Sequence, residues 1–318
     1  MRVVVMAYQD IGYVCLDELL ALGAEVALVV THPDPATENI WFRSVAERAR
    51  QASLPVLLPP SVNAPDVVAE IARLAPDFLF SFYFREIVGP DVLALARRGA
   101  LNLHGSLLPR YRGRCPVNWV LINGERETGV TLHYMEAKPD RGDIVAQRAV
   151  PIAEDDTALS LNRKLGDVAR SLLRETYPLL AAGTAPRIPQ DDARATYFGG
   201  RRPEDGRIAW DQPARRLYDL IRAVTAPYPG AFTIYRGARL FVWWARPLDL
   251  GPRLGAPGEV VEIRPGAGVV VATGSGALLL GRVQVAGRDE ERADELAVRT
   301  GLVRGERLGG DDAARERA

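Results

Sequence analysis

Two polar residues two positions apart, Asn102 and His104, have the clearest potential for chemistry in this sequence. Leu101 and Leu103 alternate with them, and side chains two apart in a β-strand share a face, so the amide and the imidazole should meet at one point. An amide can donate to a developing oxyanion, and an imidazole can move protons near neutral pH. Acyl transfer needs both. The spacing alone leaves a second interpretation open, in which Asn102 caps a turn and His104 is a satisfied buried histidine.

The elements around this pair predict a parallel sheet covered by helices on both faces. Short β-branched or aromatic runs alternate with helical stretches through the first half of the chain. The expected strands are residues 3–7, 26–31, 78–82, 101–104, 129–134 and 144–150, and a long helix is expected over 157–180. The pair would then end a strand of an open α/β sheet, which is where ligand crevices form, and Gly105 would allow a close approach to the backbone.

The second half of the chain predicts a different domain. Residues 182–210 are rich in Gly, Pro, Asp and Arg without a sustained period, which is typical of a linker. A helix with Pro213 in its first turn follows, and the period then changes to two over short segments separated by Gly and Pro. We therefore predict a Rossmann-like, doubly wound, mostly parallel α/β domain (1–190), a linker (191–210), a small OB-like β-barrel domain (211–305) and a flexible tail (306–318).

Composition narrows the functional class. Forty basic residues balance forty acidic ones, so no overall field draws the chain to nucleic acid or to an anionic membrane. Cys15 and Cys115 are too few for a disulfide framework, which fits a reducing cytosol. No apolar run approaches the roughly 20 residues of a membrane-spanning helix, and the first strand is too short for a signal peptide. The histidines form no metal triad; His133 is expected to be structural and His32 solvated.

Two motifs carry a resemblance to a known family. Residues 102–113, N-L-H-G-S-L-L-P-R-Y-R-G, resemble the signature of the 10-formyltetrahydrofolate-dependent formyltransferases, and so do G-V-T-L-H at 129–133 and D-R-G-D at 140–143. Further marks at 7–8, 81–85, 116–121 and 229–232 are most similar to the enzymes that formylate UDP-4-amino-4-deoxy-L-arabinose in lipid A modification and polymyxin resistance. The NAD-dependent decarboxylase half of the bifunctional member is missing, so the chain resembles a stand-alone, cytoplasmic formyltransferase.

The resemblance implies a set of site residues. Asn102, His104 and Asp140 would form the catalytic trio, and all three motif positions are filled. The folate donor, consumed as a cosubstrate without a metal, would lie along Glu86, Ile87, Val88, Arg114, Glu136, Ala137, Lys138, Pro139 and Asp140, mostly through backbone contacts. Arg114 suits the glutamyl tail as a cation, although Arg112 and Arg114 could also be two solvated charges beside Gly113.

The acceptor stays open at this point. A nucleotide-linked aminosugar needs cations for its diphosphate, and the candidates near the linker are Tyr197, Arg201 and Arg202. Methionyl-tRNA is the main alternative: residues 201–253 are rich in arginine, but the balanced total charge argues against a polyanion. Other UDP- or dTDP-linked aminosugars, a formyltetrahydrofolate hydrolase with water as acceptor and a silent folate-binding module are further alternatives.

Overall fold

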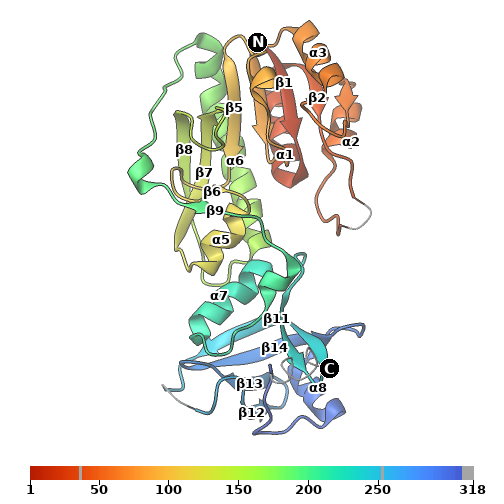
Figure 1. Cartoon of the computed structure of the whole chain (residues 1–318), viewed down its shortest axis with the longest axis vertical. Helices are drawn as coiled ribbons and strands as arrows, with labels where there is room; N and C mark the ends of the chain where they lie inside the picture. Colours follow the sequence, from red (N-terminus) through yellow and green to blue (C-terminus); the bar gives the residue numbers. More distant parts are fainter. Residues whose placement is uncertain (36–37, 252–253, 310–318) are drawn as a thin grey trace. The chain divides into compact units, whose positions relative to one another are not determined.

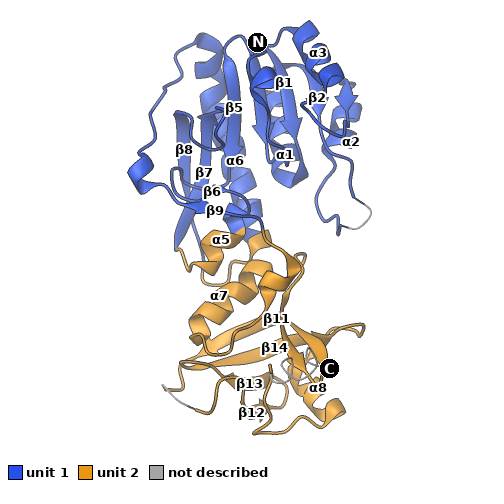
Figure 2. Ribbon diagram, viewed as in Figure 1, with its two compact units in different colours: residues 1–117, 126–153, 160–200 blue, residues 118–125, 154–159, 201–318 orange. Residues whose placement is uncertain are grey.

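A computed structural model of the 318-residue chain describes residues 1–35, 38–251 and 254–309. Its internal contacts divide it into two compact units (Figure 2). Unit 1 comprises residues 1–117, 126–153 and 160–200, and unit 2 comprises residues 118–125, 154–159 and 201–318. Two short segments of the first half therefore belong with the second unit by their contacts. Within the described ranges no helix has both the length and the apolar character needed to cross a membrane.

Unit 1 is built on a seven-stranded sheet in the order β3-β2-β1-β4-β5-β7-β8 (Figure 1). Its strands are β1 (Arg2–Ala7), β2 (Glu25–Val30), β3 (Val56–Leu57), β4 (Phe78–Phe82), β5 (Gly99–His104), β7 (Glu127–Tyr134) and β8 (Ile144–Pro151). The first five strands in the sheet order pair in parallel, whereas β7 is antiparallel to both β5 and β8. The chain leaves β1 toward one side and returns as β4 on the other, which makes a topological switch point at β1 and β4.

Helices cover both faces of this sheet, as the alternation of apolar strand residues requires. Val4 and Met6 pack in one core cluster with Val67 and Ile71 of α3 (Pro65–Leu74), so the intervening strand residues face the other side. The remaining helices of the first 182 residues are α1 (Gln9–Ala21), α2 (Val45–Gln51), α4 (Pro90–Leu93), α5 (Pro116–Ile122) and α6 (Ala158–Ala182). The predicted doubly wound α/β fold is confirmed.

Helices α1 and α6 are joined by an ion pair from a buried carboxylate. Glu18 is 3% exposed, and its Oε1 accepts a 2.8 Å hydrogen bond from Nε of Arg174. A carboxylate removed from water is costly unless a cation and hydrogen bonds compensate it, so this pair helps to hold the two helices together.

Unit 2 carries the antiparallel domain that the period-two segments predicted. The described sheet has the order β10-β11-β14-β13-β12, with β15 added on β14. Its elements are α7 (Ala214–Val224), β10 (Ala231–Tyr235), β11 (Ala238–Leu248), β12 (Val260–Arg264), β13 (Gly268–Ala272), β14 (Ala277–Val285), β15 (Glu291–Arg292) and α8 (Ala293–Thr300). The sequence analysis missed α8 because eight residues are too few to show a clear helical period. Pro213 precedes α7 as its N-cap.

Part of the predicted flexible tail is packed. Leu308 is buried, and its N–H donates to the carbonyl of Gly258 at 2.8 Å. The N–H of Gly309 donates to the carbonyl of Ile234 at 2.8 Å. Residues 306–309 were expected to be frayed because they belong to a polar terminal segment. These long-range backbone hydrogen bonds contradict the expectation. Residues 310–318 lie outside the described part of the chain.

The first part of the predicted linker belongs to unit 1. We call residues 188–198 the strap. Ile188 forms a backbone bridge with Ile144, and β9 (Tyr197–Phe198) pairs in parallel with β6 (Arg112–Gly113). The composition of residues 191–198 suggested a free connection, and their pairing partners on and beside β6 lie 80 to 85 positions earlier in the sequence, where no local pattern could reveal them. These pairings place the strap directly beside the predicted signature motif.

Asn118 offers a test of the packing between α5 and α7. Its Nδ2 donates a 2.7 Å hydrogen bond to the carbonyl of Ala223, and both groups are buried. We expect Asn118→Ala to lower the free energy of unfolding by about 1 to 3 kcal/mol, because the Ala223 carbonyl is left without its donor. Urea unfolding measures this. The control is Gln51→Ala at the exposed end of α2, with an expected change within about 0.5 kcal/mol. Equal stability of the two variants would contradict the prediction.

Candidate active site

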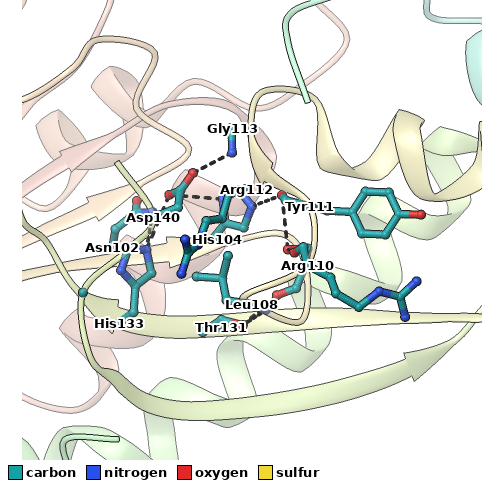
Figure 3. Close-up of polar contacts among 12 residues, drawn as sticks. Asn102, His104, Leu108, Arg110, Tyr111, Arg112, Gly113, Thr131, His133 and Asp140 are labelled. Carbon is teal, nitrogen blue, oxygen red and sulfur yellow. Dashed lines mark hydrogen bonds and ion pairs between the residues drawn. The ribbon is translucent and has the colours of Figure 1, made fainter. Parts of the chain in front are cut away.

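Three segments of unit 1 converge at the end of β5 (Figure 3). Asn102 and His104 lie on β5, and His133 of β7 stands opposite Asn102 in the antiparallel register. Asp140 lies in the turn that connects β7 with β8. Its Oδ1 is 3.5 Å from Nδ1 of His104 and 3.6 Å from Nε2 of His133. The structure therefore brings the three predicted catalytic residues into one cluster and adds a second histidine.

Backbone geometry sets the position of Asp140. Its φ is +58°, a left-handed conformation in which Asp and Asn are over-represented among non-glycine residues. The turn packs closely against Tyr134. A Cβ on Gly142 would lie 2.0 Å from the Tyr134 carbonyl oxygen. The Tyr134 N–H donates a 2.8 Å hydrogen bond to the Asp143 carbonyl. A glycine at position 142 is thus required for the turn to close on the strand end.

Carbonyl groups settle the tautomers of both histidines. A carbonyl oxygen only accepts hydrogen bonds, so Nε2 of His104, 2.7 Å from the Tyr111 oxygen, must carry a hydrogen. The Nδ1 of His104 then faces Asp140, where an added proton would meet a carboxylate. By the same argument Nδ1 of His133 donates to the Tyr134 oxygen at 2.8 Å. Its Nε2 lies 3.1 Å from Nδ2 of Asn102 and, in the neutral ring, accepts from that amide.

The electrostatics of Asp140 follow from its neighbours. Burial alone would raise the pKa of this carboxyl, since only 11% of the side chain is exposed. The charge interaction with His104, the contact with His133 and the 2.8 Å hydrogen bond from the Gly113 N–H outweigh burial and hold the pKa of Asp140 well below its ordinary value. Asp140 is therefore an anion near neutral pH.

The loop after His104 is pinned to β7 and β8. The Thr131 hydroxyl donates to the Ser106 carbonyl at 2.6 Å and accepts from the Leu108 N–H at 3.1 Å. Gln147 donates to the Leu108 carbonyl at 2.7 Å and to the Thr131 hydroxyl at 2.8 Å. Gly105 is also closely packed, because a Cβ there would lie 2.0 Å from the Tyr83 hydroxyl oxygen. The motif residues after the pair thus build a rigid loop.

Among the residues implied as folate contacts, Glu86 has an engaged side chain and Val88 a buried one. Glu86 accepts from Ser61, from the Val62 N–H at 2.7 Å and from Nδ2 of Asn63 at 3.0 Å. Ile87 is 69% exposed, whereas Val88 is buried in the core. Glu136, Ala137, Lys138 and Pro139 are exposed beside Asp140, and Arg114 is exposed with its side chain near Gly200.

The residues predicted for the acceptor lie in different units. Tyr197 belongs to unit 1, is 58% exposed and accepts a 2.6 Å hydrogen bond from Arg112 through its hydroxyl. In unit 2, the guanidinium of Arg201 lies 4.8 Å from the centre of the Trp119 ring and also donates to the Asp205 carbonyl at 2.9 Å. The backbone N–H of Arg202 donates to the Asp205 carboxylate at 2.7 Å.

The structure adds the place of His133, corrects the expectation for His32 and rules out one alternative for Arg112. His133 is part of the candidate site, because antiparallel pairing of β5 and β7 puts it opposite Asn102. His32 is not solvated: its ring stacks on Phe84 with centroids 4.2 Å apart, and its Nε2 accepts from the Arg85 N–H at 3.1 Å. Arg112 is 1% exposed, so it is not a solvated charge. The G-V-T-L-H motif pointed toward His133 and the motif at 102–113 contains Arg112, whereas nothing local marked His32.

No metal site is present in the part of the chain that the structure describes, since no three His, Cys, Asp or Glu side chains are grouped as ligands there.

Comparison with known families decides the identity of the chain. A family model described as formyl transferase matches residues 1–177, and a model of the formyl transferase C-terminal domain matches residues 201–300. The chain belongs to the formyl transferase family. The two matches cover the parallel and the antiparallel domains.

Solved structures share the fold at low sequence identity. HypX from Aquifex aeolicus is 20% identical with a TM-score of 0.64, and the match covers 96% of this chain and 49% of HypX. The chain thus spans about half of that protein. WlaRD, a sugar 3N-formyl transferase, is 18% identical with a TM-score of 0.68, covering 91% and 99%. An N-formyltransferase from Helicobacter canadensis is 17% identical with a TM-score of 0.65, covering 87% and 98%.

The lowered pKa of Asp140 generates a test of the site. The pKa of the Asp140 carboxyl is lower in the folded state than in the unfolded state, where it is about 3.9. Such a carboxyl stabilises the fold at pH values above the unfolded-state pKa. This contribution is lost as the pH falls toward the folded-state pKa. Asp140→Asn keeps the left-handed backbone and removes the titration. We compare the free energies of unfolding of the unmodified protein and of this variant. Their difference should be constant near neutral pH. Below about pH 4 the unmodified protein should lose stability relative to the variant, because Asp140 becomes protonated. Denaturant unfolding across this range measures it, and a pH-independent difference would contradict the assignment.

Proposed function

We propose that this formyltransferase transfers the formyl group of 10-formyltetrahydrofolate to the 4-amino group of UDP-4-amino-4-deoxy-L-arabinose. The proposal depends mainly on the cluster of an amide, an imidazole and a buried carboxylate at the end of β5. In it, Nδ1 of His104 lies 3.5 Å from Oδ1 of Asp140. These groups meet the needs of formyl transfer to an amine: an oxyanion donor, a proton carrier and a group that orients it.

Structural relatives support the classes of donor and acceptor. HypX has been crystallised with tetrahydrofolic acid, and WlaRD with dTDP and 5-N-formyl-THF. The Helicobacter canadensis enzyme was crystallised with folinic acid and dTDP-3-aminofucose. The choice of UDP-4-amino-4-deoxy-L-arabinose among nucleotide-linked aminosugars rests on the sequence marks at 81–85 and 116–121 and is the finer part of the proposal.

We propose that the loop after β4 and the turn after β7 bind the folate donor. Glu86 has its carboxylate engaged and Val88 is buried, so this loop would offer mainly its backbone to the pterin, whose edge of donors and acceptors suits peptide groups. Arg114 is exposed next to Gly113, and its charge suits the glutamyl carboxylates of the folate.

In the proposed reaction the neutral sugar amine attacks the formyl carbon. A new C–N bond forms and the carbonyl becomes an oxyanion, which Asn102 stabilises. One Nδ2 hydrogen of Asn102 is directed at His133, so the second remains for the oxyanion. His104 takes the proton from the attacking amine and delivers it to N10 of the folate as the C–N10 bond breaks. Asp140 orients the imidazole and compensates its charge during the transfer.

Several arginines of residues 201–253 pair with carboxylates, which reduces the basic surface available to a tRNA and favours a small acceptor. Arg222 is buried with Asp219 at 2.8 Å, and Arg236 pairs with Glu306 at 3.1 Å. Arg215 bonds to both Glu154 and Asp219. tRNA affinity depends on many basic groups left available to phosphates. Arg253 lies outside the described residues.

A substrate screen tests the proposal. With 10-formyltetrahydrofolate as donor, kcat/KM is measured for UDP-4-amino-4-deoxy-L-arabinose, for other UDP- and dTDP-linked aminosugars and for initiator methionyl-tRNA. We expect the first to be formylated fastest. A preference for the tRNA, with binding that weakens steeply as salt rises, would overturn the assignment. Release of tetrahydrofolate at the same rate without any acceptor would identify a hydrolase instead.

Asn102→Ala tests the oxyanion role. We expect kcat to fall by about 100- to 1,000-fold, the usual effect of removing one oxyanion donor. Folate affinity, measured by calorimetry, should stay close to that of the unmodified enzyme, because the amide acts on charge that develops only during the reaction. A thermal melt checks folding. A variant that loses folate binding but keeps kcat would move Asn102 from catalysis to donor binding.

A further inference from the structure

The guanidinium of Arg112 is fully enclosed, with 0% of its side chain exposed. Its Nε and one terminal nitrogen donate to Oε1 of Gln190 at 3.2 and 2.7 Å. The other terminal nitrogen donates to Asp192 at 2.8 Å and to the Tyr197 hydroxyl at 2.6 Å. All three partners lie on the strap. Removing a cation from water costs several kcal/mol unless hydrogen bonds compensate it, so the strap and Arg112 depend on each other.

Gln190 links Arg112 to the Asp140 turn. While its oxygen accepts from Arg112, its Nε2 donates to the carbonyls of Asp140 at 3.0 Å and of Gly142 at 2.8 Å. Asp192 forms a second link, because one of its oxygens accepts from Arg112 and the other from Arg141. Two strap side chains therefore connect the buried guanidinium to the turn that carries the carboxylate.

Pairing of β6 with the strap also aims a backbone donor at Asp140. The N–H groups of Arg112 and Arg114 donate to strap carbonyls at 2.8 and 2.9 Å. Alternate N–H groups of an extended strand point in opposite directions, so that of Gly113 points away from the strap and donates to Oδ2 of Asp140 at 2.8 Å. A Cβ on Gly113 would lie 2.3 Å from the Phe198 carbonyl oxygen, so only glycine allows this close pairing.

The strap supports His104 as well. The Tyr111 N–H donates to the Thr196 hydroxyl at 2.8 Å, and the Tyr111 ring stacks on Phe198 with centroids 4.8 Å apart. The carbonyl of the same Tyr111 accepts from Nε2 of His104. Both members of the His104 and Asp140 pair are thus held from the strap.

We propose that Arg112 and Gln190 are positioning residues for formyl transfer, holding Asp140 where its carboxylate orients His104. This inference rests on the role of Asp140 in the proposed function. It predicts that the strap contributes to turnover and not only to stability, although it contains none of the three residues of the trio.

A double-mutant cycle of Gln190→Ala with Asp140→Asn tests the inference. Activity is measured with 10-formyltetrahydrofolate and UDP-4-amino-4-deoxy-L-arabinose. We expect Gln190→Ala to lower kcat by about 10- to 100-fold with KM nearly unchanged, since a small misplacement of a catalytic group has effects of this size. In the Asp140→Asn background the same change should cost about twofold or less, because there is no carboxylate left to position. Equal fold-losses in both backgrounds would overturn the proposal.

A second variant separates positioning from support of the strap. Gln190→Glu still accepts from Arg112 but cannot donate to the carbonyls of Asp140 and Gly142. We expect a melting temperature close to that of the unmodified enzyme together with a lowered kcat, and a normal kcat would contradict the inference. The control is Glu18→Gln, which weakens another buried ion pair of unit 1 and should lower the melting temperature without changing kcat.

A spectroscopic measurement keeps the test independent of the acceptor. The ring-nitrogen NMR signals of His104 should shift in Gln190→Ala in the same direction as in Asp140→Asn, and Glu18→Gln should leave them in place. Unshifted signals in Gln190→Ala would overturn the inference alone. If Asp140→Asn changes neither kcat nor these signals, the role of Asp140 in the proposed function fails, and the inference fails with it.

Discussion

The Asp140 carboxylate, held between two imidazoles and one backbone amide, is the interaction on which the candidate site depends. A buried anion is unfavourable unless hydrogen bonds and favourable charges compensate it; here the Gly113 N–H donates to it, and the rings of His104 and His133, which carry a favourable charge when protonated, lie 3.5 and 3.6 Å away. These groups come from three separate strands. The site can therefore form only when β5, β6 and β7 have taken their final positions, which ties the chemistry to the complete fold of unit 1.

The change from parallel to antiparallel pairing at β5 explains how this convergence is reached. β5 ends the parallel series, so Asn102 and His104 lie at the edge where ligands bind in open α/β sheets. The antiparallel β7 then returns along β5 and puts His133 opposite Asn102. Two backbone carbonyls, from Tyr111 and Tyr134, fix the tautomers of the two histidines, so side-chain chemistry here is set largely by main-chain geometry.

A shared fold does not choose the acceptor. The three structural relatives named above are 17 to 20% identical to this chain, and one fold can support several unrelated substrates. The arginine side chains differ in whether other groups of the protein engage them. In unit 2 carboxylates compensate Arg215, Arg222 and Arg236, and in unit 1 Arg112 is fully engaged by the strap, whereas Arg114 stays exposed beside the trio.

The sequence by itself determined the local features of this protein. Strand periodicity located β4 to the residue and the other long strands of unit 1 to within a few residues, and the motif at 102–113 identified the family, because these signals lie within short stretches of chain. Only the tertiary structure decided that His133 joins the site, that Arg112 is buried, that the strap pairs with β6 and that residues 306–309 are packed. Each of these features depends on which segments, distant in the sequence, pack against one another in the fold. Local sequence patterns do not specify those contacts.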